Sequence, residues 1–134
     1  MAALILFDTD VLIDFLRGEE GARAEVTAVP VAQRSLSAVT HMELLRGARD
    51  ARDRDSVDRF VEASFGEIQQ IDGGISREAT TLVRAFGLSH GLRIPDALVA
   101  ATAATRGLRL VTGNLRHFQF IPNLNAELPA YRRA

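Results

Sequence analysis

Residues 4–14 read LILFDTDVLID, in which four apolar residues precede three aspartates within seven positions. Apolar runs are buried in folded proteins, whereas carboxylates stay in water unless a partner compensates for their burial. Residues 4–7 therefore predict a buried strand, and we expect Thr9 or Asp10 to cap a helix that continues to about Arg17. A buried strand that ends in acids suggests that the acids belong to a site.

The remainder of the chain alternates short apolar segments with longer helical patterns. Predicted strands cover residues 31–36, 67–72 and 108–112, with an edge strand near 125–128, and predicted helices cover residues 19–28, 38–48, 49–64, 73–90 and 95–107. Strands that alternate with helices form right-handed crossovers and a parallel sheet that is covered on both faces. We therefore predict an α/β fold, a single domain over residues 1–134 with a central parallel sheet flanked by helices on both faces.

The composition excludes several classes of protein. The chain has 134 residues, of which 47% are hydrophobic and 25% charged, as in one globular domain. Without cysteine it has no disulfide framework, no thiolate metal site and no thiol nucleophile. No apolar stretch reaches the roughly 18 residues that span a bilayer, so we expect no membrane partner and a cytoplasmic location. The net charge of −1 means that nucleic acid would be bound by a local patch.

Two predicted strands end in groups that can bind ligands. Asp8 directly follows the strand at 4–7, and Thr112 and Asn114 close the strand at 108–112. In open parallel sheets, ligand sites form outside the carboxyl ends of the strands. We therefore expect all three side chains to face one crevice.

Two further acids lie on predicted helices. Glu43 has apolar and small neighbours one helical turn away, an unusual setting for a solvated acid. Asp96 begins an alanine-rich helix whose small side chains allow it to lie close to the sheet. Convergence with Asp8 would then place three carboxylates in one crevice. Converging carboxylates repel one another unless a cation neutralises them, and Mg²⁺ bound by one or two carboxylates also promotes phosphodiester hydrolysis.

Each of these residues has a simpler interpretation when it is taken singly. Asp8, Asp10 and Asp96 have the positions of helix caps or turn residues, and Asp14 is expected to be solvated. The three histidines lack paired ligand spacing and are interpreted as structural or surface residues: His41, His90 and His117. The arginine clusters at 46–54 and 132–133 are interpreted as solvated faces.

Four segments, in order, carry a family resemblance. They are LFDTDVLIDFL (6–16), SAVTHMELLRGA (37–48), IPDALVAATA (94–103) and LVTGNLRHF (110–118). Together they resemble the PIN-domain ribonucleases, and among these the VapC toxins of type II (VapBC) toxin–antitoxin systems. The resemblance implies an endoribonuclease that depends on Mg²⁺, or alternatively Mn²⁺. It also implies a homodimer that a cognate VapB-type antitoxin holds inactive in a higher-order hetero-oligomer.

The resemblance assigns the four acidic positions of the family to Asp8, Glu43, Asp96 and Asn114. It implies that Asp8 and Asp96 ligate the metal and that Glu43 orients or deprotonates the attacking water. The amide of Asn114 replaces a carboxylate of the family pattern, so it remains open whether the site binds one metal ion or two.

The resemblance also extends to neighbouring residues. Thr112 and Asp10 match polar positions that line the pocket of the family. Apolar side chains of the first helix are expected to be exposed for the hydrophobic part of the antitoxin: Leu12, Phe15 and Leu16.

Two other functions remain open from the sequence. FDTDVL also resembles the strand end of haloacid-dehalogenase-type phosphatases, in which Asp8 would be the nucleophile and Asp10 the acid/base. Those enzymes usually need a downstream acidic pair, and the sequence shows none. The second alternative is an inactive interaction module, which the presence of Asp8, Glu43 and Asp96 disfavours.

Overall fold

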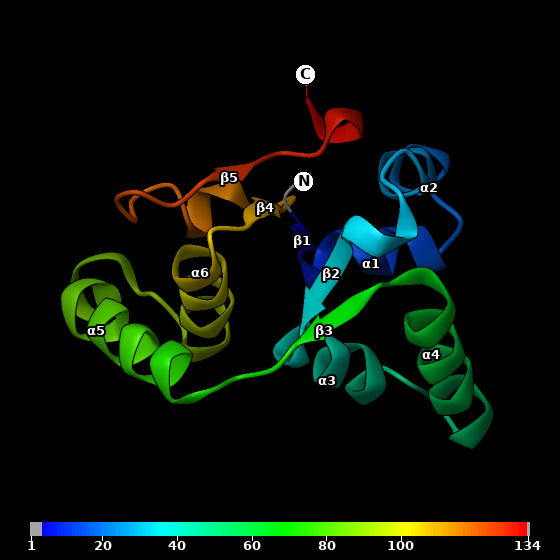
Figure 1. The fold of residues 1–134 in the computed structure, drawn as a ribbon, viewed down its shortest axis with the longest axis horizontal. Coiled ribbons are helices and arrows are strands. Elements are labelled where there is room, and N and C mark those ends of the chain that lie inside the picture. The colour runs from blue at the N-terminus through cyan, green and yellow to red at the C-terminus, as the bar shows by residue number, and fades with distance from the viewer. Residues whose placement is uncertain (1–3, 134) are drawn as a thin grey trace.

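A parallel sheet of five strands forms the centre of the molecule in the computed structural model, which describes residues 4–133 (Figure 1). The strands are β1 (Ile5–Phe7), β2 (Arg34–Ser37), β3 (Glu67–Gln69), β4 (Arg109–Val111) and β5 (Ala126–Glu127). Their order is β3-β2-β1-β4-β5, and every neighbouring pair is parallel. β1 is therefore central, as its apolar sequence predicts.

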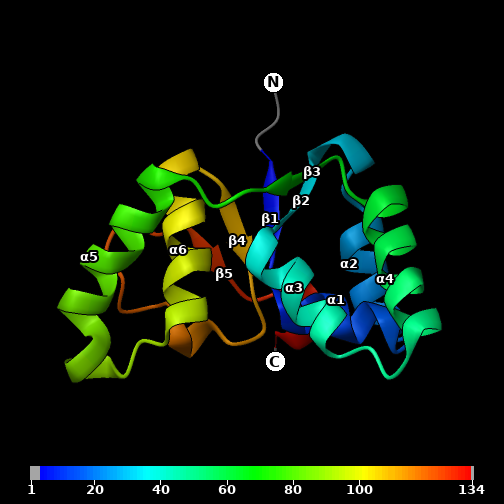
Figure 2. The ribbon, with the colours of Figure 1, turned by 90° about the horizontal axis from the view of Figure 1, so that it is seen from below.

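Helices cover both faces of this sheet. They are α1 (Thr9–Leu16), α2 (Glu20–Thr27), α3 (Ala38–Arg46), α4 (Ala51–Ser64), α5 (Gly73–His90) and α6 (Ile94–Arg106). Short 3₁₀ turns lie at η1 (Val31–Gln33), η2 (Leu115–His117) and η3 (Ala130–Arg132). Figure 2 shows α5 and α6 on one side of the strands and α1, α2 and α4 on the other. The predicted α/β fold class is confirmed.

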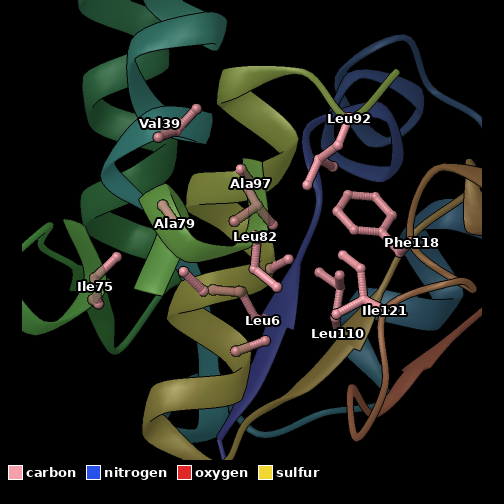
Figure 3. Packing of buried hydrophobic residues seen from close by; sticks show 14 of the residues in the cluster. Leu6, Val39, Ile75, Ala79, Leu82, Leu92, Ala97, Leu110, Phe118 and Ile121 are labelled. Carbon is pink, nitrogen blue, oxygen red and sulfur yellow. The ribbon is translucent and has the colours of Figure 1, made fainter. Parts of the chain in front are cut away.

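Successive residues of the strands point to opposite faces of the sheet and so build two cores. Leu6 and its register partner Leu110 pack with α5 and α6 (Figure 3). Phe7 and its partner Val111 pack with α1, α2 and α4. All four side chains are at most 1% exposed, so the central strands are buried on both faces.

The small side chains of α6 place its first turn near the end of the sheet. Its buried residues include Ala97, Ala100, Ala101 and Ala103. The helix begins with Pro95 in its first turn and ends at Gly107, which adopts the left-handed conformation (φ 64°) that glycine tolerates best. Asp96 is thereby carried to the same edge of the sheet as the end of β1.

Several local predictions differ from the structure. The cap of α1 is Asp8 instead of Thr9 or Asp10, because the Asp8 carboxylate accepts the Thr9 backbone N–H at 2.9 Å. The extended segment predicted at 31–36 starts with the turn η1. β3 is shorter than predicted at 67–72, since the Arg106 side chain takes the Gln70 carbonyl at 2.9 Å.

One surface prediction is also wrong. Leu12 is fully buried in the core beneath α1, and only Leu16 of the predicted apolar surface is clearly exposed, at 42%. Helical periodicity places Leu12 and Leu16 on neighbouring parts of the helix, but Leu16 lies at its last turn, beyond the core. Within residues 4–133, no helix is both long and apolar enough to cross a membrane.

The two-sided core predicts unequal costs for two leucine truncations. Leu110→Ala removes a fully buried side chain and should lower the free energy of unfolding by about 2–5 kcal/mol. Leu88→Ala is the matched control, because Leu88 is fully exposed at 104% and its truncation should change stability by less than about 0.5 kcal/mol. Urea unfolding followed by circular dichroism measures both, and equal losses would contradict the described core.

Candidate active site

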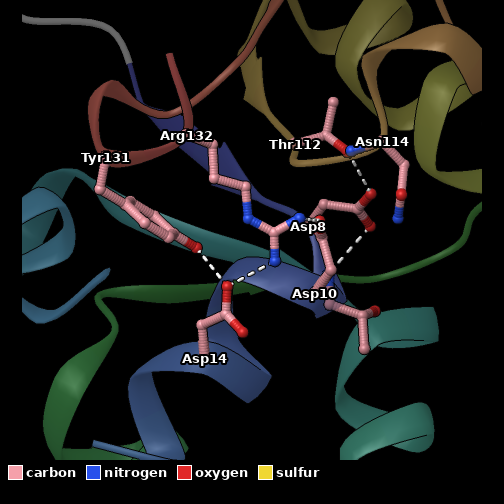
Figure 4. Close-up of polar contacts among 8 residues, drawn as sticks. Asp8, Asp10, Asp14, Thr112, Asn114, Tyr131 and Arg132 are labelled. Atoms are coloured by element: carbon pink, nitrogen blue, oxygen red, sulfur yellow. Dashed lines mark hydrogen bonds and ion pairs between the residues drawn. The ribbon is translucent and has the colours of Figure 1, made fainter. Parts of the chain in front are cut away.

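The candidate site lies where the order of the strands reverses. From β1 the sheet extends through β2 in one direction and through β4 in the other, which is the position where open parallel sheets bind ligands. Asp8 follows β1 and Thr112 follows β4. The Thr112 hydroxyl donates to Asp8 Oδ2 at 2.8 Å and joins the two strand ends (Figure 4).

Asp8 is a carboxylate that the fold buries without an ion pair to any basic side chain of residues 4–133. Its side chain is 7% exposed, and its two oxygens accept hydrogen bonds from Thr112 and from the Thr9 backbone. Burial, together with the nearby charges of Asp10 and Asp96, raises the pKa of Asp8 to about 7 against the lowering effect of the hydrogen bonds from Thr112 and Thr9. A group in this condition favours either a proton or a bound cation.

Asp96 approaches from the first turn of α6 and is half-buried. Burial raises its pKa, while the charges of His117 and Arg93 lower it and that of Glu43 raises it. His117 Nδ1 lies 3.7 Å from Asp96 Oδ2. The prediction that His117 is a structural or surface residue is therefore incomplete, because its ring faces a site residue.

Glu43 reaches the site from α3. Ser37 caps that helix and accepts the Val39 N–H at 3.0 Å, as the sequence predicts. The Glu43 side chain is exposed, but the Thr9 hydroxyl donates to its Oε1 at 2.6 Å. Thr9 itself lies 3.1 Å from the buried Thr40 hydroxyl. Glu43 is thus held by the Thr9 hydroxyl through one carboxylate oxygen.

Asp10 and Asp14 contact side chains of the C-terminal segment, those of Tyr131 and Arg132 (Figure 4). Arg132 pairs with Asp14 and lies 3.4 Å from Asp10 Oδ2, and the Tyr131 hydroxyl donates to Asp14 at 2.7 Å. These contacts lower the pKa of Asp14 despite the opposing effect of burial. The predictions that Asp14 is solvated and that Arg132 lies on a solvated face are therefore wrong.

The ion pair between Asp10 and Arg132 requires glycine at position 113. A Cβ atom at this position would collide with the Asp10 carboxylate and with the Arg132 guanidinium. Both carboxylate oxygens of Asp10 are buried without a well-formed hydrogen bond from residues 4–133. Burial raises the pKa of Asp10, and the charge of Arg132 opposes that rise.

Asn114 lies beside the Asp8–Thr112 hydrogen bond. Its backbone N–H donates to the Thr112 hydroxyl at 3.0 Å. Its φ of −110° excludes a left-handed turn as the reason for asparagine at this position. Thr112 therefore connects the Asn114 backbone to Asp8, and a role for the Asn114 side chain in the site stays a prediction.

The structure brings the predicted residues to one edge of the sheet without forming a ready-made metal cluster. The charge of Asp96 raises the pKa of Asp8, and the charge of Glu43 raises the pKa of Asp96. However, no three histidine or acidic side chains among residues 4–133 are arranged to surround an ion. The acids therefore form a negative crevice in which water must supply most ligands of any bound cation.

A family model supports this interpretation. The model described as "PIN domain" matches residues 5–121, which include all of the acids discussed above. Over 123 residues, the chain is 38% identical to ribonuclease VapC10 of Mycobacterium tuberculosis, covering 90% of each chain.

The chain belongs to the PIN-domain family of VapC ribonucleases. It is also 32% identical to ribonuclease VapC19 of M. tuberculosis, over 89% of this chain and 95% of that protein. Among solved structures, a toxin–antitoxin complex from Klebsiella pneumoniae superposes with a TM-score of 0.77 at 31% identity, covering 93% and 97% of the two chains. The haloacid-dehalogenase alternative is therefore wrong.

Sequence reasoning missed three residues of this PIN-domain site. Thr9 positions Glu43, His117 faces Asp96, and Arg132 pairs with Asp10. Thr9 could have been found from the sequence, because it lies between Asp8 and Asp10 in the first motif. His117 follows Asn114 by three residues, but nothing in its spacing pointed to Asp96.

The raised pKa of Asp8 predicts how stability depends on pH when EDTA is present. The folded protein holds the Asp8 proton up to about pH 7, whereas the unfolded chain releases it near the ordinary value of 3.8. The free energy of unfolding should therefore fall by a few kcal/mol as the pH rises between those values, and then level off. Asp8→Asn keeps a capping side chain and should remove most of this fall.

Chemical unfolding from pH 4 to pH 8 measures this dependence. A smaller fall should remain in Asp8→Asn, since burial also raises the pKa of Asp10 and Asp96. Asp55→Asn, at an exposed position of α4, is the control and should keep the full dependence. An equal slope for the wild type and Asp8→Asn would show that another group titrates.

Proposed function

We propose that this chain is a divalent-metal-dependent endoribonuclease that acts as the toxin of a toxin–antitoxin pair. The observation that carries the proposal is the buried carboxylate of Asp8, which repels Asp96 and forms no ion pair with a basic side chain of residues 4–133. The relatives of this chain that are named ribonuclease VapC10 and ribonuclease VapC19 support RNA as the substrate. RNA as the substrate is also the reason for proposing a cytoplasmic location.

The residues fit a hard cation such as Mg²⁺, with Mn²⁺ as the alternative. Mg²⁺ binds through one or two carboxylates and keeps several waters, so a three-acid cluster is not required. Asp8 and Asp96 are the proposed ligands, since both are buried enough to favour a neutralising charge. When bound, the ion would polarise the phosphodiester and shield its leaving oxygen.

The side chains of the protein orient the reacting groups. Glu43 is the proposed group that orients or deprotonates the attacking water, because Thr9 holds one of its oxygens and leaves the other available. Thr112 fixes the Asp8 carboxylate by donating to Oδ2. Asp10, paired with Arg132, is the proposed polar neighbour of Asp8, whose pKa its charge raises. Glu43, Asp8 and Asp96 thus act from three separate elements on one phosphate group.

The proposed partners follow from the relatives. A cognate VapB-type antitoxin is supported by the toxin–antitoxin complex from K. pneumoniae, which shares 31% identity with this chain. A cationic side chain of the antitoxin would neutralise Asp8 and Asp96 as a metal does. We also propose a homodimer and a higher-order hetero-oligomer with antitoxin, for which Ile94 offers an exposed apolar contact.

Cleavage of an RNA pool tests the proposed activity. The wild type should cleave with Mg²⁺ and stop with EDTA, while Asp96→Asn should lose cleavage and remain folded. Asp58→Asn, on the exposed side of α4, is the charge-matched control and should cleave normally. An Asp96→Asn protein that cleaves RNA normally, or cleavage that persists in EDTA, would contradict the proposed site. A folded wild type that cleaves no RNA would indicate an inactive interaction module.

Asn114 provides a second test of the crevice. Its side chain can hydrogen-bond a water or a phosphate oxygen but carries no charge for a second cation. Asn114→Ala should lower the cleavage rate by about 10²-fold, as for other single polar groups placed at a reacting centre. Asn114→Asp should lower the Mg²⁺ concentration needed for half-maximal cleavage, because it adds a carboxylate.

Titration of cleavage against Mg²⁺ compares the wild type with both Asn114 variants. The wild-type saturated rate and metal requirement are the references. If all three proteins have the same metal requirement and the same saturated rate, then Asn114 has no part in the site and only joins Thr112 through its backbone.

A further inference from the structure

A second cleft opens beside the candidate site, next to Asp96. It has a volume of about 170 Å³, and the side chains that matter here are Asp96, His117, His90, Phe120, Arg93 and Arg116. Asp96 belongs both to this cleft and to the acidic crevice. A molecule bound in the cleft would therefore continue directly into the crevice of Asp8.

Two arginines give the cleft a positive charge. The guanidinium groups of Arg93 and Arg116 are exposed, and within residues 4–133 neither has an ion pair or a side-chain hydrogen bond. Arg49 and Arg54, by contrast, are paired locally with Asp53 and Asp55. Free guanidinium groups that line a cleft are suited to phosphate, which they bind through paired hydrogen bonds.

Two flat rings form another wall of the cleft. The rings of His90 and Phe120 stack with centroids 4.3 Å apart and an angle of 18° between their planes. Phe86 packs against both, at 5.6 Å and 5.2 Å, and the Ser89 hydroxyl lies 2.8 Å from His90 Nδ1. His90 is exposed, so it offers a supported aromatic platform to a ligand. Unpaired RNA bases bind to such platforms by stacking.

We propose that this cleft is a nucleotide-binding subsite for single-stranded RNA. A phosphate of the strand contacts Arg93 and Arg116, and a base stacks on the platform of His90 and Phe120. The neighbouring phosphodiester then lies at Asp8 and Asp96. The inference rests on the proposed ribonuclease function and adds to it the direction in which the strand leaves the crevice.

A peptide of the antitoxin is a poorer match for this cleft than RNA. The structure offers a larger and more apolar groove of about 610 Å³ between α1, α3 and α4, where Leu16, Leu44 and Val57 are among the lining residues. That groove suits the hydrophobic side chains of a peptide. The smaller cleft offers charge and flat rings, which suit a phosphate and a base.

Binding of a labelled short single-stranded RNA tests the two arginines. All proteins carry Asp8→Asn, which prevents cleavage during the measurement. Replacing Arg93 and Arg116 together by Gln should raise the Kd roughly tenfold at low salt and reduce the slope of log Kd against log salt by about 0.7 for each arginine. Replacing Arg52 and Arg59 together by Gln, an equal loss of two charges on α4, should change neither quantity.

The platform is tested separately with His90→Ala. This exposed substitution should raise the Kd by about tenfold while the salt slope stays the same, because stacking releases no counterions. Phe120→Leu keeps an apolar support and should have a smaller effect. An RNA that lacks its bases should bind equally well to the proteins with and without His90→Ala, because it has no base to stack on the platform.

The outcomes distinguish this inference from the proposed function. If the arginine and His90 variants bind RNA with the same Kd and salt slope as the reference protein, the subsite is overturned. Cleavage of RNA by the unmodified protein would still leave the ribonuclease proposal intact. If the unmodified protein neither binds nor cleaves RNA, both proposals fail. Variants that lose antitoxin binding but keep RNA binding would assign the cleft to the antitoxin and overturn the subsite.

Discussion

The hydrogen bond from Thr112 to Asp8 joins the ends of the two central strands and orders the site around them. It fixes a carboxylate in a position that is only 7% exposed, where ionisation is unfavourable without a cation. The first turn of α1 depends on the same side chain, since Asp8 also accepts the Thr9 N–H. Thr9 in turn holds Glu43, so one buried acid organises a helix cap, a strand pair and the position of a second acid.

The architecture and the main acids could be predicted because they follow from local patterns. An apolar run before Asp8 requires a buried strand, and alternating strands and helices place its end at a ligand-binding edge. The alanines that follow Asp96 allow α6 to lie close to the sheet, and burial of those alanines confirms the reasoning. Order along the chain was therefore enough to bring Asp8 and Asp96 to one crevice, although it did not show that the acids lack a closed cluster.

The remaining contacts depend on residues that are distant in the chain and have no periodic signal. Arg132 sits in a run of charged residues that is typical of a solvated terminus, yet it pairs with Asp14 across 118 positions. His117 lies in a short turn whose direction no pattern specifies. Leu12 was misplaced for a related reason, because one face of α1 meets the core and the other meets the C-terminal segment. Tertiary packing decides each of these cases.

The separation in sequence between the joined residues also affects how the protein is made. Asp8 and Thr112 are 104 positions apart, so the acid leaves the ribosome well before the hydroxyl that fixes it. At synthesis rates of about 5–20 residues per second, this interval lasts roughly 5–20 seconds. During that time β1 has no β4 beside it, and the crevice has only one of its walls. A growing chain therefore lacks the hydrogen bond that fixes Asp8 until β4 has been made.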